Sequence, residues 1–230
     1  MAWGTPTDIG NAHSSGSSFV GKNGVTVPAG SLIVILVHEN NGTGSIAGTV
    51  TDTASNTYHL AGSIEGFGGH FFQIFYAYNV NALSSQSINY ASHYASFLLV
   101  DIEIVGMYVS GEKTISDPFD SSSFATASAA TSSPSVTSGT PAATGELFVG
   151  ATVLIGATPT LTQSSGWSAP PNEYKLTSVV DILCGTKVNA GGSAQTYNPT
   201  SPGSYEFLTL IASFKAPSSS AGFNMPMLGM

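Results

Sequence analysis

Apolar residues recur in short runs along the chain, and a turn-rich polar segment separates each run from the next. Within residues 100–105, Val100, Ile102 and Ile104 alternate with acidic residues, so they would share one face of a β-strand. Apolar residues do not repeat at helical spacing over a helix length anywhere in the chain. The pattern therefore predicts an all-β protein. The clearest predicted strands cover residues 31–37, 71–76, 96–105, 146–155, 176–183 and 205–214, and shorter ones cover 25–27, 48–51, 58–60, 87–90 and 135–137. The core side chains predicted on the long strands are Leu32, Val34, Leu36, Ile74, Leu98, Val100, Ile102, Phe148, Ile182, Leu208 and Leu210.

The two halves of the chain show the same order of predicted strands. In each half a short strand leads through a turn into a long strand, at residues 25–34 and again at 136–149. Each half then has a loop with an aromatic residue, Tyr58 or Trp167, and closes with a long strand that contains Phe-Leu. We expect two similar four-stranded units whose apolar faces pack together. The predicted fold is a two-sheet antiparallel β-sandwich of the jelly-roll type, formed by residues 1–215 as a single domain.

Two segments depart from this pattern. Residues 121–144 are nearly all Ser, Ala, Thr, Gly and Pro, and we interpret them as a polar crossover with short edge strands, with a flexible linker as the alternative. Residues 216–230 form a Ser- and Gly-containing spacer followed by the apolar, Met-rich peptide 223–230. This peptide would expose a contiguous apolar patch in water, so we expect it to dock on a neighbouring subunit or another protein of the same assembly, with a frayed terminus as the alternative.

Composition narrows the possible partners and compartments. Only 8% of the 230 residues are charged, and five Lys and thirteen acids give a net charge of −8. Neither nucleic acid nor a membrane is an expected partner, because both attract basic surfaces. The single cysteine excludes an internal disulfide, and residues 1–6 lack the features of a classical signal peptide. This combination is typical of a virion protein made in the host cytoplasm; the alternative is an extracellular protein exported by a signal-free route.

Several motifs carry a resemblance to a known family. They include Val-Thr-Asp-Thr-Ala-Ser-Asn-Thr-Tyr-His-Leu-Ala-Gly at residues 50–62 and Phe-Tyr-Ala-Tyr-Asn-Val at 75–80, and others lie at 117–120, 144–151, 165–167 and 210–215. Together they resemble a lectin-like jelly-roll module found in tailed-phage structural proteins and in bacterial surface or secreted proteins. The resemblance covers about residues 20–215. It implies a sandwich fold with a decoration, adhesion or sugar-binding role, and it supplies no catalytic residues.

Candidate chemistry is sparse. The chain has no G-x-S-x-G, phosphate-binding loop, H-E-x-x-H or C-x-x-C motif, so no catalytic residue is predicted. The five histidines are dispersed along the sequence, so neither a metal nor a cofactor is expected. Asp101 and Glu103 would share a strand face, but nothing marks a cleft for glycoside hydrolysis. Asp52 and Asn56 lie in a loop, where capping of the turn is the favoured interpretation and Ca²⁺ binding the alternative.

These observations predict a non-enzymatic structural protein of a tailed-phage virion: capsid decoration, a spike or a fibre component. It would assemble with copies of itself and with other virion proteins through apolar and backbone contacts. The alternative is a carbohydrate-binding or adhesin module of a bacterial surface or secreted protein, with host-surface glycans as partners. A flat apolar face would favour assembly, and a concave, aromatic-lined groove would favour sugar. The candidate partner-contact residues are Phe67, Phe71, Phe223, Met225, Met227, Leu228 and Met230, and the candidate sugar-binding residues are Trp167, Tyr174 and Tyr197.

Overall fold

The computed structural model describes residues 3–40, 48–93, 101–110, 116–169, 174–176, 180–189 and 191–217. The apolar peptide 223–230 and the predicted core residues Leu98 and Val100 lie outside this described part. Every regular element of the described chain is a strand, and none of its residues is helical. The all-β prediction is therefore confirmed.

The central strands of the first half are buried on both faces almost throughout, whereas its outer strands include exposed positions. The strands of the first half are β1 (Pro6–Ser15), β2 (Phe19–Val27), β3 (Leu32–Asn40), β4 (Thr49–Asp52), β5 (His59–Gly66), β6 (His70–Ala77), β7 (Leu83–Ala91) and β8 (Asp101–Val109). The second half contains β9 (Phe119–Thr131), β10 (Val136–Thr137), β11 (Glu146–Ile155), β12 (Tyr174–Leu176), β13 (Val180–Asn189), β14 (Thr196–Tyr197) and β15 (Tyr205–Phe214).

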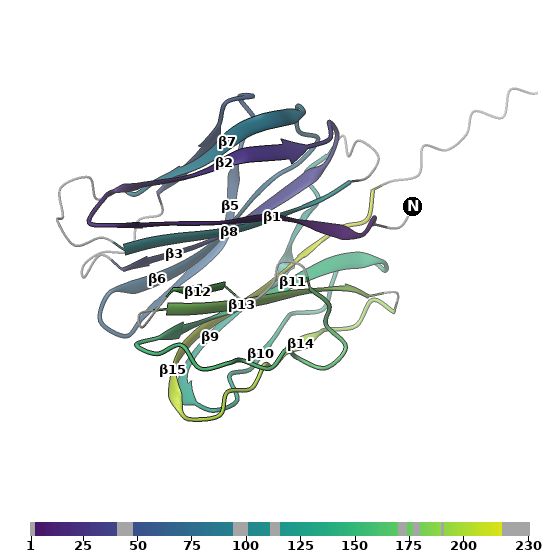
Figure 1. The fold of residues 1–230 in the computed structure, drawn as a ribbon. Helices are drawn as coiled ribbons and strands as arrows, with labels where there is room; N and C mark the ends of the chain where they lie inside the picture. Colours follow the sequence, from purple (N-terminus) through teal and green to yellow (C-terminus); the bar gives the residue numbers. More distant parts are fainter. Residues whose placement is uncertain are drawn as a thin grey trace, which may run out of the picture.

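Two five-stranded antiparallel sheets form the centre of the molecule. One has the strand order β1-β8-β3-β6-β5, and the other has the order β12-β13-β11-β15-β9. A smaller sheet lies behind each of them, β2-β7-β4 behind the first and β10-β14 behind the second. Figure 1 shows β2 and β7 above the first five-stranded sheet, and the second five-stranded sheet below it. The predicted two-sheet β-sandwich is thus confirmed for the central pair of sheets.

The two central sheets have the same strand order when the strands are numbered within each half without β4, which has no counterpart among the described strands of the second half. The strands β9, β15, β11, β13 and β12 take the places of β1, β8, β3, β6 and β5. In the smaller sheets, β10 pairs with β14 where β2 pairs with β7. The repeat expected from the sequence is therefore visible in the topology. Its unit is larger than four strands, because each half supplies a five-stranded sheet and a smaller sheet behind it.

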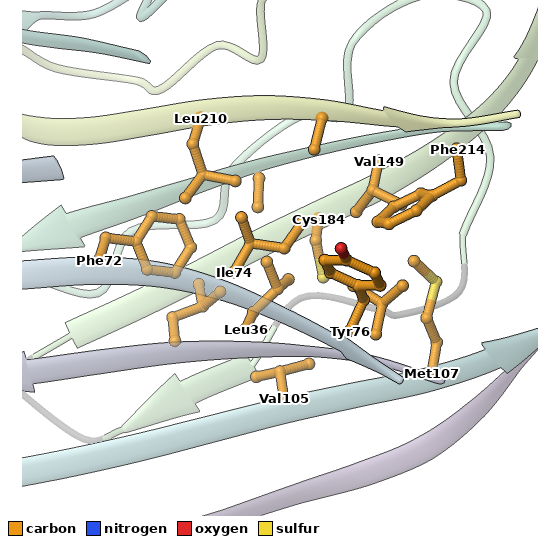
Figure 2. Close-up of a cluster of buried hydrophobic side chains, with 14 of the residues drawn as sticks. Leu36, Phe72, Ile74, Tyr76, Val105, Met107, Val149, Cys184, Leu210 and Phe214 are labelled. Carbon is orange, nitrogen blue, oxygen red and sulfur yellow. The ribbon is translucent and has the colours of Figure 1, made fainter. Parts of the chain in front are cut away.

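The main core lies between the two five-stranded sheets, in a layer that we call the seam. Figure 2 shows Leu36, Phe72 and Ile74 of the first sheet packed against Leu210 and Phe214 of the second. Burial of each such side chain contributes roughly 1.5–3 kcal/mol, so the seam holds the halves together strongly. A second core fills the space between the first five-stranded sheet and β2-β7-β4. Nine predicted core residues are buried: Leu32, Val34, Leu36, Ile74, Ile102, Phe148, Ile182, Leu208 and Leu210.

The structure differs from the predicted elements in several places, and β1, which belongs to the first central sheet, lies where no strand is predicted. Residues 119–131 form one long strand, β9, at the edge of the second central sheet, where the composition predicts a crossover with short strands. The small Ser, Ala and Thr residues of β9 pair with β15 through the backbone, so no apolar run is needed. In place of the single strand predicted over residues 176–183, β12 and β13 form an antiparallel pair.

Candidate functional site

A groove of about 420 Å³ opens beside the first five-stranded sheet, between the loop after β4 and the loop after β6. Polar side chains and two aromatic rings line it. A concave surface of this kind is where small ligands bind most often, since it surrounds them with several contacts at once. The lining residues are Ser55, Asn56, Thr57, His59, Tyr78, Asn79 and Asn81.

Asp52 organises the first loop of the groove. Its Oδ1 accepts hydrogen bonds from the backbone N–H groups of Ala54 at 2.9 Å and Asn56 at 3.1 Å. Its Oδ2 accepts from Asn56 Nδ2 at 2.8 Å and from the Tyr58 hydroxyl at 3.0 Å. Burial and the adjacent Asp52 charge raise the pKa of Tyr58 well above its ordinary value, so its hydroxyl stays a donor. Both carboxylate oxygens therefore cap the turn, which is the favoured interpretation of Asp52.

Asn56 and Asn81 tie the two loops of the groove together. The Asn81 backbone N–H donates to Asn56 Oδ1 at 2.6 Å, and Asn56 Nδ2 donates to the Asn81 carbonyl oxygen at 3.2 Å. Asn81 Nδ2 in turn donates to the Ala54 carbonyl oxygen at 3.2 Å. Next to this link, Asn79 has a φ of 49°, a left-handed conformation that asparagine adopts more readily than most residues. The walls of the groove are thus held in place before any ligand arrives.

Aromatic rings form the other side of the groove. The half-buried rings of His59 and Tyr78 are stacked, with centroids 5.6 Å apart and planes 23° apart. Tyr76 lies behind them, 5.3 Å from the His59 ring, and its hydroxyl donates to the Asp117 carboxylate at 2.8–2.9 Å. Burial, reinforced by Asp117, raises the pKa of Tyr76. The stack supports Tyr78 from behind, so its ring is fixed at the wall.

The free groups of the groove define the ligand that it could hold. Among the described residues, the hydroxyls of Ser55, Thr57 and Tyr78 and the amide of Asn79 make no hydrogen bond within the protein. None of the lining residues is a lysine or a carboxylate. Neutral donors and acceptors beside an aromatic wall suit a neutral ligand that carries several hydroxyl groups and also has an apolar face.

A second cleft of about 440 Å³ lies between the N-terminal segment and the second half. Its lining includes Trp3, Leu147, Lys187 and Val188. The Trp3 ring is only 8% exposed, and its Nε1–H donates to the Phe214 carbonyl oxygen at 3.0 Å, so the ring serves to close the seam. This cleft offers a ligand little aromatic surface and fewer free polar groups than the groove.

The predicted sugar-binding residues do not form an exposed aromatic platform. Trp167 and Tyr197 are buried and meet edge to face, with ring centroids 4.9 Å apart. The Trp167 Nε1–H donates to the Thr196 carbonyl oxygen at 2.9 Å. Tyr174 is half-buried on β12, away from this pair. Trp167 and Tyr197 thus plug the core of the second half, and a stacked sugar could not reach their rings.

The predicted partner-contact residues are only partly described. Phe67 has a φ of 45° in the turn between β5 and β6, and its ring packs against the seam core. Phe71 is buried on β6. Both rings therefore point inward, where packing within the chain accounts for them. Phe223, Met225, Met227, Leu228 and Met230 lie outside the described residues.

Three of the five histidines, which are far apart in the sequence, come together in the fold. His38 Nδ1 lies 2.5 Å from Glu103 Oε2, and His38 Nε2 lies 2.9 Å from His70 Nδ1. His13 Nε2 lies 3.7 Å from Glu103 Oε1. The expectation that the histidines are scattered is therefore wrong for these three. In the described part of the chain, no three His, Cys, Asp or Glu side chains are placed to hold a metal ion.

Comparison with known proteins adds no relative: no family model, no curated protein and no solved structure matches the chain. The described residues form no helix that could cross a membrane. The residues of the groove are therefore the basis on which a function can be assigned.

Proposed function

We propose that this protein is a non-enzymatic β-sandwich module that binds a neutral glycan in the groove between the loops after β4 and β6. One observation carries the proposal: a concave site that combines a supported tyrosine ring with neutral, unpaired hydroxyl and amide groups. Sugars present C–H faces that pack on aromatic rings, and hydroxyls that need donors and acceptors. The groove meets both requirements within a frame that is already rigid, which lowers the entropy cost of binding.

The fold is consistent with this proposal of a β-sandwich binding module. A jelly roll joins eight strands through two Greek keys, with its first and last strands adjacent in one sheet. The order β1-β8-β3-β6, backed by β2-β7-β4, has that feature, and the order β9-β15-β11-β13 repeats it. We therefore infer a lectin-like jelly-roll topology in the first half and a related seven-stranded arrangement in the described second half. Because such sandwiches host many functions, the glycan proposal still depends on the groove rather than on the fold.

The setting that fits best is the surface of a tailed-phage virion, where copies of this chain and other virion proteins would present the groove to host-surface glycans. A bacterial surface or secreted adhesin is the alternative setting. The described surface favours binding over assembly through a flat apolar face. Its large exposed apolar side chains, Phe19, Leu60 and Val188, lie on three different strands and are no more than such surfaces usually show.

The direct test is binding to an array of neutral and acidic glycans by the wild-type protein and by Tyr78→Ala. Loss of the ring contact should weaken binding of a neutral glycan at least about tenfold, because each 1.4 kcal/mol corresponds to a factor of ten. Phe19→Ala removes an exposed ring elsewhere and should bind as wild type does. Asn79→Gly keeps the left-handed backbone and removes only the amide, so it tests the groove without risk to the stack. Absence of any glycan ligand, or full binding by both groove variants, would overturn the proposal.

A further inference from the structure

A row of ionisable side chains crosses the first five-stranded sheet. The strand register places His13 of β1 opposite Glu103 of β8, and Glu103 opposite His38 of β3. His70 at the start of β6 is the last member of this row, through its 2.9 Å contact with His38. Figure 1 shows these strands as neighbours in one sheet. Residues that are far apart in the sequence are therefore joined in one line.

This row of ionisable side chains faces the seam between the two halves. His38 lies on the same strand face as Leu36, and Glu103 lies on the same face as Val105, both of which belong to the seam core. His38 and Glu103 are fully buried. Tyr174 of the second half lies near enough for the Glu103 charge to add to the effect of burial in raising the pKa of Tyr174. The row of ionisable side chains thus lies where the two halves meet.

The hydrogen-bond geometry limits how many protons the two imidazoles can hold. One nitrogen of His38 donates to the Glu103 carboxylate, and its other nitrogen shares a single hydrogen with His70. One additional proton can be accommodated, because the pair then exchanges donor and acceptor while Glu103 balances the charge. A second additional proton would put a hydrogen on both facing nitrogens, His38 Nε2 and His70 Nδ1, which are 2.9 Å apart. That state cannot keep the hydrogen bond.

The groups around the pair do not relieve this conflict. In the described part of the chain, the charged or titratable neighbours are Glu103 and Asp101 on β8, His13 on β1 and Tyr174 on β12. Glu103 can balance only one imidazolium, and Asp101, which lies 3.9 Å from His13, favours a charged His70 less than burial and the His38 charge oppose it. Burial, followed by the His38 charge, lowers the pKa of His70 to about 4, against an ordinary value of 6.5. The unfolded chain therefore takes up this proton first, and stability is lost as the pH falls from about 6.5 towards 4.

The turn between β5 and β6 is the element that this contact controls. His70 follows the turn directly, and Gly66 precedes it at the end of β5. A Cβ on Gly66 would lie 2.9 Å from Leu208 of the second half, so the turn packs closely against that half. We propose that His13, Glu103, His38 and His70 form an acid-sensitive latch. It holds the β5–β6 turn against the second half, and it opens when both His38 and His70 are protonated.

The test compares the wild type with His70→Gln between pH 7 and pH 4. Glutamine can still donate to His38, but it does not titrate. Thermal unfolding should show that the wild type loses about 6–12 °C more than His70→Gln over this range. Hydrogen exchange, corrected for its intrinsic pH dependence, should show amides 64–71 losing protection at pH 4 in the wild type only. The exposed His93→Gln variant is the matched control and should follow the wild type.

A second measurement guards against a His70→Gln variant that fails to fold. An NMR titration of the wild-type imidazoles should show His70 remaining neutral to below about pH 5 and His38 bonded through both nitrogens. The proposal is overturned if His70→Gln loses stability in acid as the wild type does. A His70 that titrates near 6.5 in the folded wild type would overturn it equally.

Discussion

Gly150→Ala should destabilise the protein strongly, because the Tyr197 ring lies directly on the backbone of β11. Gly150 sits in the middle of that strand, paired with Gly185 on one side and Ile211 on the other. A Cβ at Gly150 would lie 2.4 Å from Tyr197 Cγ, 2.6 Å from Cδ2 and 2.8 Å from Cβ. These atoms are at the base of a fully buried side chain, so a rotamer change cannot move them aside.

The expected cost has three parts. Overpacking of a core costs about 1–3 kcal/mol. Displacing Tyr197 also strains the hydrogen bond from its hydroxyl to the Leu183 carbonyl oxygen, worth about 1 kcal/mol. The edge contact with Trp167 adds roughly 0.5–1.5 kcal/mol. Gly150→Ala should therefore cost about 4 kcal/mol, or about 8–16 °C in Tm for a chain of this size.

Urea and thermal unfolding of four proteins measure this effect: wild type, Gly150→Ala, Tyr197→Ala and the double variant. Tyr197→Ala removes most of the clashing atoms, so the added methyl should cost less than about 1 kcal/mol in that background. Gly191→Ala is the matched control, because a Cβ there meets only Asn189 Oδ1 at an ordinary 3.6 Å. A Gly150→Ala protein that melts within about 1 °C of the wild type would refute the placement of Tyr197 as a core plug.

Two further predictions concern carboxylates that the fold holds in polar networks. Glu146 is buried and accepts hydrogen bonds from Ser213 Oγ and the Ala143 N–H, and burial raises its pKa, with Asp120 adding to the effect. The unfolded chain therefore loses this proton first, so the free energy of unfolding falls as the pH rises above about 4.5. Urea unfolding of Glu146→Gln should show a stability that depends less on pH than that of the wild type. An unchanged pH dependence would contradict the raised pKa of Glu146. Asp52→Ala removes the acceptor of four hydrogen bonds, and thermal unfolding should show a loss of about 2–3 kcal/mol together with weaker glycan binding; a variant with wild-type stability would show that Asp52 does not organise the loop.

Strands that are defined by apolar runs could be predicted from the sequence. The predicted bounds of residues 146–155 and 205–214 coincide with β11 and β15, since both strands are buried on two faces. The composition of β9 does not predict a long strand, because its residues are small and polar and pairing with β15 alone determines its conformation. Apolar periodicity therefore predicts the centre of this fold better than its edges.

The sites could not be predicted in the same way, because long-range register creates them. His13 and Glu103 are ninety residues apart, and only the β1–β8 pairing brings them opposite one another. The groove likewise joins Asp52 and Asn56 to Asn81. The sequence offered a partial signal in Tyr-Asn-Val-Asn at 78–81, which directly follows a buried strand, but it did not indicate which loop would face that motif.

The location of the bound sugar tests the central claim most directly. Backbone NMR spectra should be recorded while a neutral glycan selected from the array is titrated into the wild-type protein. We expect the shift changes to concentrate at residues 55–59 and 78–81, which line the groove, and to disappear in Tyr78→Ala. Shift changes centred on Trp3, Lys187 and Val188, or spread over the surface without saturation, would contradict the assignment of the groove as the glycan-binding site.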